Sequence, residues 1–319
     1  MKGGLAILIV AAAALTAVPF VVTNEFYLNL ASQILIYALL AVSLNLLLGY
    51  GGMVSLGHAS FVGLTSYAAV LMLNAGFGHL LSAAMAIAFS TLCGALFGLL
   101  ALRASGIGFL MITLALGQIV WGIAYRANTI TGGDNGIRYA ARPRPLGFDI
   151  SSAPTFYWFT LIVFAIALFF IWRLTRSPFG AALQGARDQP RRMRMLGHNV
   201  WLIQWMTFVL AAFWGSVAGL LYIDYSLFVS PHAISLQQSA EVLLMAILGG
   251  ASSLTGPIVG AVIITLVKNV ASSYIDRWNS LLGAIFVIVI LFMPLGLVPG
   301  VRAMWLRWTR PAKKPEAAP

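Results

Sequence analysis

The sequence predicts an all-α polytopic membrane protein, with about ten transmembrane helices and one long cytoplasmic loop that contains two short helices. Three observations predict this class. The chain of 319 residues is 61% hydrophobic and only 8% charged, with a mean hydropathy of +0.93, whereas soluble domains carry about 25% charged residues. Its apolar residues form stretches of about 20, the length that crosses a bilayer. Its Lys and Arg residues gather mostly between these stretches, where charged residues of membrane proteins belong.

Ten apolar segments have roughly the length of a membrane span. They are Leu5–Val22, Leu28–Leu48, Val54–Leu73, Leu80–Leu102, Ile107–Tyr125, Phe156–Trp172, Leu202–Tyr222, His232–Leu248, Leu254–Ser272 and Leu281–Val298. The first segment follows Lys2 and has the position of a signal peptide. It has no clear small-residue cleavage site, so we expect a retained helix.

The Lys and Arg residues predict the orientation of the chain. With the N-terminus placed in the cytoplasm and the spans alternating, thirteen of these residues fall inside and five outside. The positive-inside rule therefore predicts that both termini and the loop at residues 173–200 are cytoplasmic. We expect one transmembrane domain over residues 1–300 and a basic cytoplasmic tail over residues 301–319.

The loop at residues 173–200 has a helical pattern of its own. Ser177 can cap a helix that starts at Pro178, because proline fits the first helical position. An apolar stripe follows at helical spacing, and it consists of Phe179, Ala182, Leu183 and Ala186. We expect Asp188 to cap a second short helix that ends at Gly197. Six arginines lie in this loop against one acid. The loop is either only a topological anchor or a surface that docks into another protein.

Two predicted turns on the cytoplasmic side are rich in glycine. They lie in Leu48–Leu64 and Leu248–Val262, and both contain the pattern G-G-x-x-S-L. One interpretation is that small residues let membrane helices approach closely. The other is that glycines interrupt the helices where irregular backbone lines a polar path. Ser55, Gly57 and His58 are the candidates for such a path, although a histidine here also fits simple packing.

The segment His232–Leu248 is polar in its outer half. A glutamate near the centre of a helix costs about 2.5–3.5 kcal/mol on insertion, by analogy with aspartate, while each Leu or Ile returns only about 0.3–0.6 kcal/mol. We therefore expect neighbouring helices or a wet cavity to shelter this helix. Gln238 and Glu241 become candidate path residues. Asp224 and Lys268 lie nearer to span ends, where solvation is easy, and the sequence assigns them no role.

The longest outer loop, Arg126–Phe156, offers a docking ledge. It contains the turn signal T-G-G-D-N-G at residues 131–136. Pro143 and Pro145 stiffen the chain after this turn. The loop is too short to form a domain.

Several classes of chemistry have no support in the sequence. The pattern G-x-x-x-x-G-K-[ST] is absent, so ATP hydrolysis would need another chain. Cys93 is the only cysteine and permits no internal disulfide. The four histidines are far apart, and no catalytic set, metal-ligand spacing or cofactor motif stands out. We expect neither an enzyme nor a metal or cofactor site.

Five stretches carry a family resemblance. They read NEFYLNLASQILIYALLAVSLNLLLGYGGMVSLGHASFVGLTSYAA near the N-terminus, TGGDNGI in the outer loop, SPFGAALQGARDQPRRMRMLGHNV in the arginine-rich loop, and EVLLMAILGGASSLTGPIVGA and MPLGLVPG towards the C-terminus. Through these stretches, nearly the whole chain resembles the permease subunits of branched-chain amino acid ABC importers, in particular the M-type (LivM-like) subunit. The pair Arg191-Arg192 is more basic than is usual in that family.

The resemblance implies a non-catalytic permease of a bacterial inner membrane that works by alternating access. It implies a second permease of the LivH type, two cytoplasmic ATPase subunits and a periplasmic solute-binding protein. The coupling role of the family falls on Phe179, Gly180, Ala186, Arg187, Asp188, Leu196 and Gly197. Urea and short-amide permeases share much of the pattern, which leaves the solute open. An ion-coupled secondary transporter is the alternative from another class, but it would usually carry more intramembrane ionisable groups than Glu241.

Overall fold

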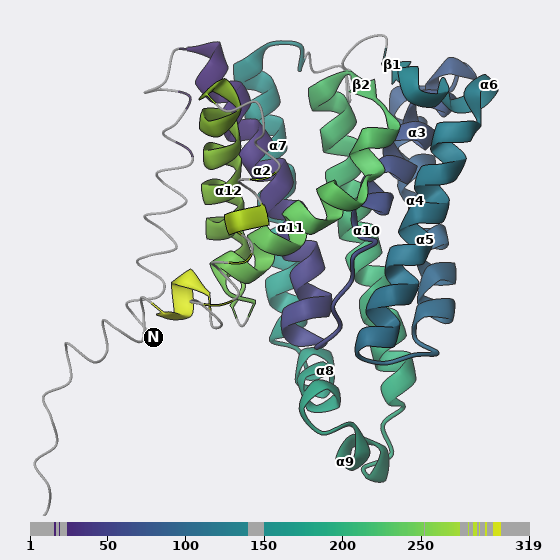
Figure 1. Cartoon of the computed structure of the whole chain (residues 1–319), viewed down its shortest axis with the longest axis vertical. Coiled ribbons are helices and arrows are strands. Elements are labelled where there is room, and N and C mark those ends of the chain that lie inside the picture. The colour runs from purple at the N-terminus through teal and green to yellow at the C-terminus, as the bar shows by residue number, and fades with distance from the viewer. Residues whose placement is uncertain are drawn as a thin grey trace, which may run out of the picture.

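The computed structural model describes Thr16, Pro19, residues 24–139, 150–251, 253–274, 280, 283–285, 287, 291 and 296–300. The predicted first span and the tail 301–319 lie outside these residues, apart from Thr16 and Pro19. The predicted last span lies mostly outside them. The described helices form an elongated bundle, with the arginine-rich loop at one end (Figure 1).

Helix α2 lies at the centre of the bundle. The main elements in chain order are α2 (Glu25–Asn45), the π-helical turn η1 (Leu46–Tyr50), α3 (Ala59–Asn74), α4 (His79–Ala101), α5 (Ile107–Arg126), α7 (Ala153–Thr175), α8 (Pro178–Asp188), α9 (Pro190–Met195), α10 (Val200–Ser226), α11 (Leu236–Gly249) and α12 (Gly256–Tyr274). Helix α2 packs against α7, α10, α11 and α12. Every residue from Leu35 to Leu47 is buried, as expected for a helix that is apolar on all sides.

Five helical stretches in the described part are long and apolar enough to cross a membrane. They are Glu25–Tyr50, His79–Ala101, Ile107–Arg126, Ala153–Thr175 and Val200–Ser226, and each coincides with a predicted span. Helices α3, α11 and α12 coincide with three more predicted spans but are shorter apolar helices by the same measure. The prediction of a multi-pass α-helical protein is therefore confirmed, while the number of ten spans stays a prediction.

Helix α4 shows how the helices pack. Its buried residues are all small; they are Ser82, Ala86, Ser90, Gly94, Gly98 and Ala101. Its large residues point outwards; they include Leu81, Phe89, Leu92, Leu96 and Leu99. A Cβ added at Gly94 would lie only 2.3 Å from Cβ of Ala212 on α10. The small residues thus set the close approach of the helices, and the large ones face the surroundings, as in membrane bundles generally.

Between α2 and α3 the chain leaves the helical conformation. Residues 51–58 are irregular and run inside the bundle (Figure 1). The predicted span Val54–Leu73 therefore becomes an α-helix only at Ala59. Gly57 has no room for a side chain, because an added Cβ would lie 2.3 Å from a backbone oxygen of α5. Irregular backbone is tolerated at membrane depth when protein surrounds it.

The opposite end of the bundle from α8 and α9 carries a small strand pair (Figure 1). Its elements are α6 (Asn128–Thr131), η2 (Gly133–Asn135), β1 (Ile137–Arg138), β2 (Phe228–Val229) and η4 (Pro231–Ile234). The strands are antiparallel, with Ile137 opposite Val229. The predicted turn is confirmed, since Gly132, Gly133 and Gly136 have φ values of +70°, +57° and +63°, which favour glycine.

Candidate functional site

The arginine-rich loop forms two short helices, α8 and α9, at one end of the bundle (Figure 1). Ser177 Oγ accepts the backbone N–H of Gly180 at 3.4 Å, and Pro178 occupies the first position of α8. The predicted start of this helix is therefore confirmed. Helix α8 lies against α7, α10 and η1. Leu183 and Ala186 of the predicted apolar stripe are buried there, so the stripe packs on its own chain.

The expected role of Asp188 as a helix cap is wrong. Asp188 is the last residue of α8, and α9 begins at Pro190. The cap position belongs to Gln189, which has φ −145° and ψ 74° and makes no side-chain cap bond. The Asp188 carboxylate instead accepts the Nε–H of Arg187 at 2.8 Å. The bend between the two helices is therefore set by the backbone at Gln189 and Pro190.

Arg187 reaches from α8 into the bundle. Its Nη1 donates a hydrogen bond to the backbone carbonyl of Gly49 in η1. Its aliphatic part lies over Gly52, where an added Cβ would be 2.6 Å from Cγ of Arg187. Since η1 continues directly from α2, this one side chain joins the arginine-rich loop to the central helix.

The two glycine-rich turns meet at the same place. A Cβ added at Gly49 would lie 1.8 Å from the carbonyl oxygen of Ala251 in the second turn. Asn45 Nδ2 also donates a hydrogen bond to the carbonyl of Ser253 at 3.0 Å. The glycines therefore do allow the two turns to approach each other closely, which was one interpretation. The first turn also contains irregular backbone, which the other interpretation required. A path along that backbone stays a prediction.

The far end of the arginine-rich loop is exposed. Met195 and Leu196 are 86% and 73% exposed, and Gly197 has a φ of +82°, as predicted for the residue that ends the second helix. The arginines of this tip are also exposed; they are Arg191, Arg192 and Arg194. Of the predicted coupling residues, the buried or half-buried ones are Phe179, Gly180 and Ala186, and the exposed ones are Arg187, Asp188, Leu196 and Gly197.

The predicted path residues of the irregular segment, Ser55, Gly57 and His58, are all buried. The Nε2 atom of His58 lies 2.8 Å from Oγ of Ser43 on α2. The imidazole ring also meets Phe61 edge to face, with 5.3 Å between ring centroids. These contacts are those of a packed histidine that holds the irregular segment against α2.

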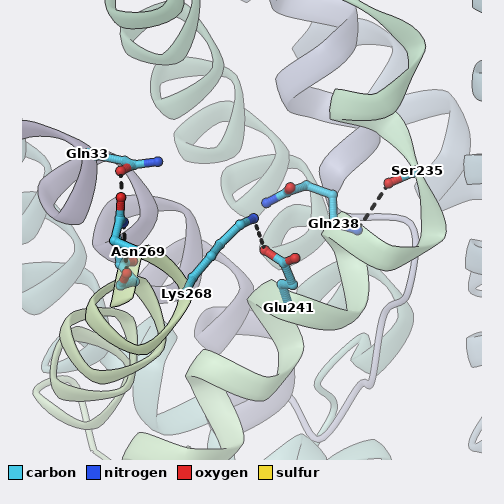
Figure 2. A network of polar contacts seen from close by, with 7 residues as sticks. Gln33, Ser235, Gln238, Glu241, Lys268 and Asn269 are labelled. Atoms are coloured by element: carbon cyan, nitrogen blue, oxygen red, sulfur yellow. Dashed lines mark hydrogen bonds and ion pairs between the residues drawn. The ribbon is translucent and has the colours of Figure 1, made fainter. Parts of the chain in front are cut away.

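The two predicted path residues of α11 are also buried. Gln238 is 8% exposed and Glu241 is 1% exposed, so the expectation of a sheltered helix is confirmed. Glu241 Oε2 forms an ion pair of 2.7 Å with Nζ of Lys268 on α12 (Figure 2). Sequence reasoning missed this partner. A signal was present, because the two residues are about equally far from the turn between α11 and α12, and a helical hairpin brings such residues opposite each other.

The predicted path residues fall into two separate networks. His58 bonds to Ser43 on α2, whereas Glu241 bonds to Lys268 on α12. The two regions touch where the backbone N–H of Ala59 donates to Oγ of Ser239 at 3.3 Å. Across the described part of the chain, no three His, Cys, Asp or Glu side chains gather in a way that could hold a metal ion.

Asp224 has a structural role that the sequence did not indicate. It is 2% exposed, so the expectation of easy solvation was wrong. The hydroxyl of Tyr139 hydrogen-bonds to its carboxylate. Burial, and then this carboxylate, raise the pKa of Tyr139, so the phenol keeps its proton and donates it. Asp224 thereby ties the chain after β1 to the end of α10.

The sequence is similar to known transport proteins. The family described as branched-chain amino acid transport system / permease component matches residues 26–294. The chain is 28% identical to the high-affinity branched-chain amino acid transport system permease protein LivM of Salmonella typhimurium, over 89% of this chain and 72% of that relative. It is 24% identical to the corresponding protein LivH of Escherichia coli, over 82% and 91%. It is 27% identical to the autoinducer 2 import system permease protein LsrD of Klebsiella pneumoniae, over 86% of each chain. No solved structure matches it.

Proposed function

This chain belongs to the family of branched-chain amino acid transport system permease components and is of the LivM type, and on that premise we propose that it is the transmembrane subunit of an ATP-driven importer. It forms the translocation path by alternating access, and separate chains hydrolyse the ATP. The proposed solute is a branched-chain or related amino acid. A relative of similar identity is named for autoinducer 2 import, so similar permeases differ in their solute. Because urea and short-amide permeases share much of the sequence pattern, a urea or short-amide solute is the alternative to test.

The arginine-rich loop is the observation that carries this proposal. Its tip at Met195 and Leu196 is exposed, while Arg187 holds its first helix to the Gly49 carbonyl beneath α2. An exposed apolar pair among arginines suits contact with another protein. A force applied there by an ATPase would reach the central helix through Arg187. A loop that served only as a topological anchor would need neither feature.

The proposal includes a topology. Residues 1–300 form one permease domain of about ten spans, and the basic tail 301–319, both termini and the loop 173–200 are cytoplasmic. The membrane is the inner membrane of a bacterial cell. The position of α8 and α9 at the end opposite β1 and β2 supports this arrangement (Figure 1), as does the gathering of arginines at that one end.

The proposed assembly contains a second permease of the LivH type, two ATPase subunits and a periplasmic binding protein. Similarity of the chain to both LivM and LivH supports a pair of related permeases. The strand pair at Ile137–Arg138 and Phe228–Val229 offers the outer surface for the binding protein. The ATPases would bind at the opposite end.

Reconstituted transport tests the proposal. The chain is co-purified with its partner permease and ATPases, inserted into liposomes and supplied with binding protein and radiolabelled leucine. We expect leucine uptake that requires ATP, and no ATP hydrolysis above background by this chain alone. Uptake of urea but not leucine would support the alternative solute. Uptake driven by an ion gradient without the ATPases would contradict the ATP-driven mechanism and favour a secondary transporter.

A further inference from the structure

An ion pair lies inside the helical bundle, between α11 and α12. Glu241 is 1% exposed and Lys268 is 27% exposed at the side chain, with 2.7 Å between Oε2 and Nζ (Figure 2). A buried ion pair is a poor means of stabilising a fold, since apolar residues of similar volume are often at least as stable. Ionisable groups inside a membrane bundle mark solute pathways more often than they mark packing.

Further polar side chains surround this pair, and they come from three helices. Gln238 lies one turn before Glu241 on α11, and Figure 2 shows its side chain directed towards the pair. Asn269 of α12 donates through Nδ2 to Oε1 of Gln33 on α2, at 3.4 Å. The side chain of Gln238 is buried and hydrogen-bonds to the phenol of Tyr37 on α2.

Gln238 also borders a small cavity on the side of α2. The cavity has a volume of about 10 Å³, room for one water molecule. The residues that line it are Ile36, Tyr37, Leu40, Val62, Tyr222, Ala233 and Gln238. Apolar side chains and the rings of Tyr37 and Tyr222 therefore lie on one side of Gln238, and the Glu241–Lys268 pair lies on the other. In the conformation described, the space is too small for an amino-acid side chain.

We propose that the Glu241–Lys268 pair is a binding site for the charged end of a zwitterionic amino acid, a proposal that rests on the proposed importer function. The ammonium group of the solute bonds to the Glu241 carboxylate, and its carboxylate bonds to the Lys268 ammonium group. Gln238, beside the pair, donates an amide N–H to the same carboxylate. The aliphatic side chain of the solute occupies the apolar cavity once α11 moves away from α2.

Charge balance favours a zwitterion over a simple ion. One ion pair becomes two when the zwitterion enters, so the net charge of the site stays at zero. A single anion or cation would leave one net charge in a medium of low dielectric constant, which is expensive. A neutral solute such as urea would break the Glu241–Lys268 bond without replacing either charge.

Paired substitutions separate a binding role from a structural role. Glu241→Gln with Lys268→Met removes both charges together and leaves no unpaired charge in the bundle. We expect this double variant to co-purify with the ATPases at the parent yield and to lose at least about tenfold of its maximal leucine uptake. Ser90→Ala is the matched control. It removes the buried hydrogen bond that Ser90 Oγ accepts from Ser216 on α10 at 2.8 Å and the one that it donates to the carbonyl of Phe61 at 3.1 Å. It should leave uptake within about twofold of the parent.

Normal uptake by the double variant would overturn the proposal, because a purely structural pair is dispensable once both charges are gone. Should that variant fail to assemble, the parent complex decides the matter without substitution. Leucine should raise its melting temperature in the absence of binding protein, whereas leucinol and 4-methylpentanoate, which carry one charge each, should not. Equal shifts by all three, or no shift with leucine, would also overturn it. A parent complex that transports no leucine with ATP would contradict the proposed function itself.

Discussion

Replacement of Arg187 by methionine tests whether the arginine-rich loop acts on the central helix. Methionine keeps an unbranched chain over Gly52 and removes the hydrogen bond to the Gly49 carbonyl. A hydrogen bond from a charged donor contributes about 1.5–3 kcal/mol. Because the Arg187 side chain is 37% exposed, the lower end applies, about 1.5 kcal/mol, or roughly tenfold in an equilibrium constant.

The assay is the number of ATP molecules hydrolysed per leucine taken up, in proteoliposomes that contain the whole complex. We expect Arg187→Met to assemble and to hydrolyse ATP, but to raise this ratio by up to about tenfold, because the hydrogen bond that couples α8 to the Gly49 carbonyl of η1 is lost. Arg173→Met is the control. It makes the same charge change at an exposed position near the end of α7, and should keep the parent ratio. An unchanged ratio in Arg187→Met would refute a mechanical role for this side chain.

Four further substitutions have expected outcomes. Asp188→Ala should lower the free energy of unfolding by less than about 1 kcal/mol, since it breaks an exposed ion pair. Gly197→Val places a branched side chain at a φ of +82°, so it should lower that free energy by about 1–2 kcal/mol and reduce co-purification of the ATPases. In a chain without Cys93, the cysteine introduced by Arg192→Cys should not be labelled by impermeant thiol reagents in intact cells. Labelling from outside would contradict the proposed cytoplasmic position of this loop. Gly260→Ala would place Cβ 1.8 Å from a backbone oxygen of α11 and should cost about 1–3 kcal/mol, measured as a lower melting temperature.

Local signals predicted the start of α8 well, because they depend only on adjacent residues. Ser177 and Pro178 specify a helix start by their own chemistry, whatever the rest of the chain does. The assignment of Asp188 as a cap failed by one residue. Helix α8 continues through Asp188, so the residue that precedes α9 is Gln189. Where two helices follow each other closely, the boundary depends on whether the residue between them continues the first helix or precedes the second.

The irregular segment and the ion pair were harder to predict, because each depends on contacts with distant parts of the chain. The glycine-rich stretch around Gly57 left open whether the helix is interrupted, and the helix begins only at Ala59 because Gly57 packs on the backbone of α5. Glu241 was correctly expected to be sheltered, since its insertion cost demands it. Its partner Lys268 comes from the next helix, so it emerges only once the two segments are paired as a hairpin.

Helix α10 has a consequence for how the two ends of the protein communicate. Its 27 residues run without interruption from Val200, just after the exposed tip, to Ser226, just before β2. At 1.5 Å per residue this is a rod of about 40 Å. A continuous helix resists compression along its axis, so an axial displacement at one end must appear at the other. In the proposed assembly, α10 would therefore connect the outer surface offered to a binding protein with the end offered to the ATPases by one continuous helix.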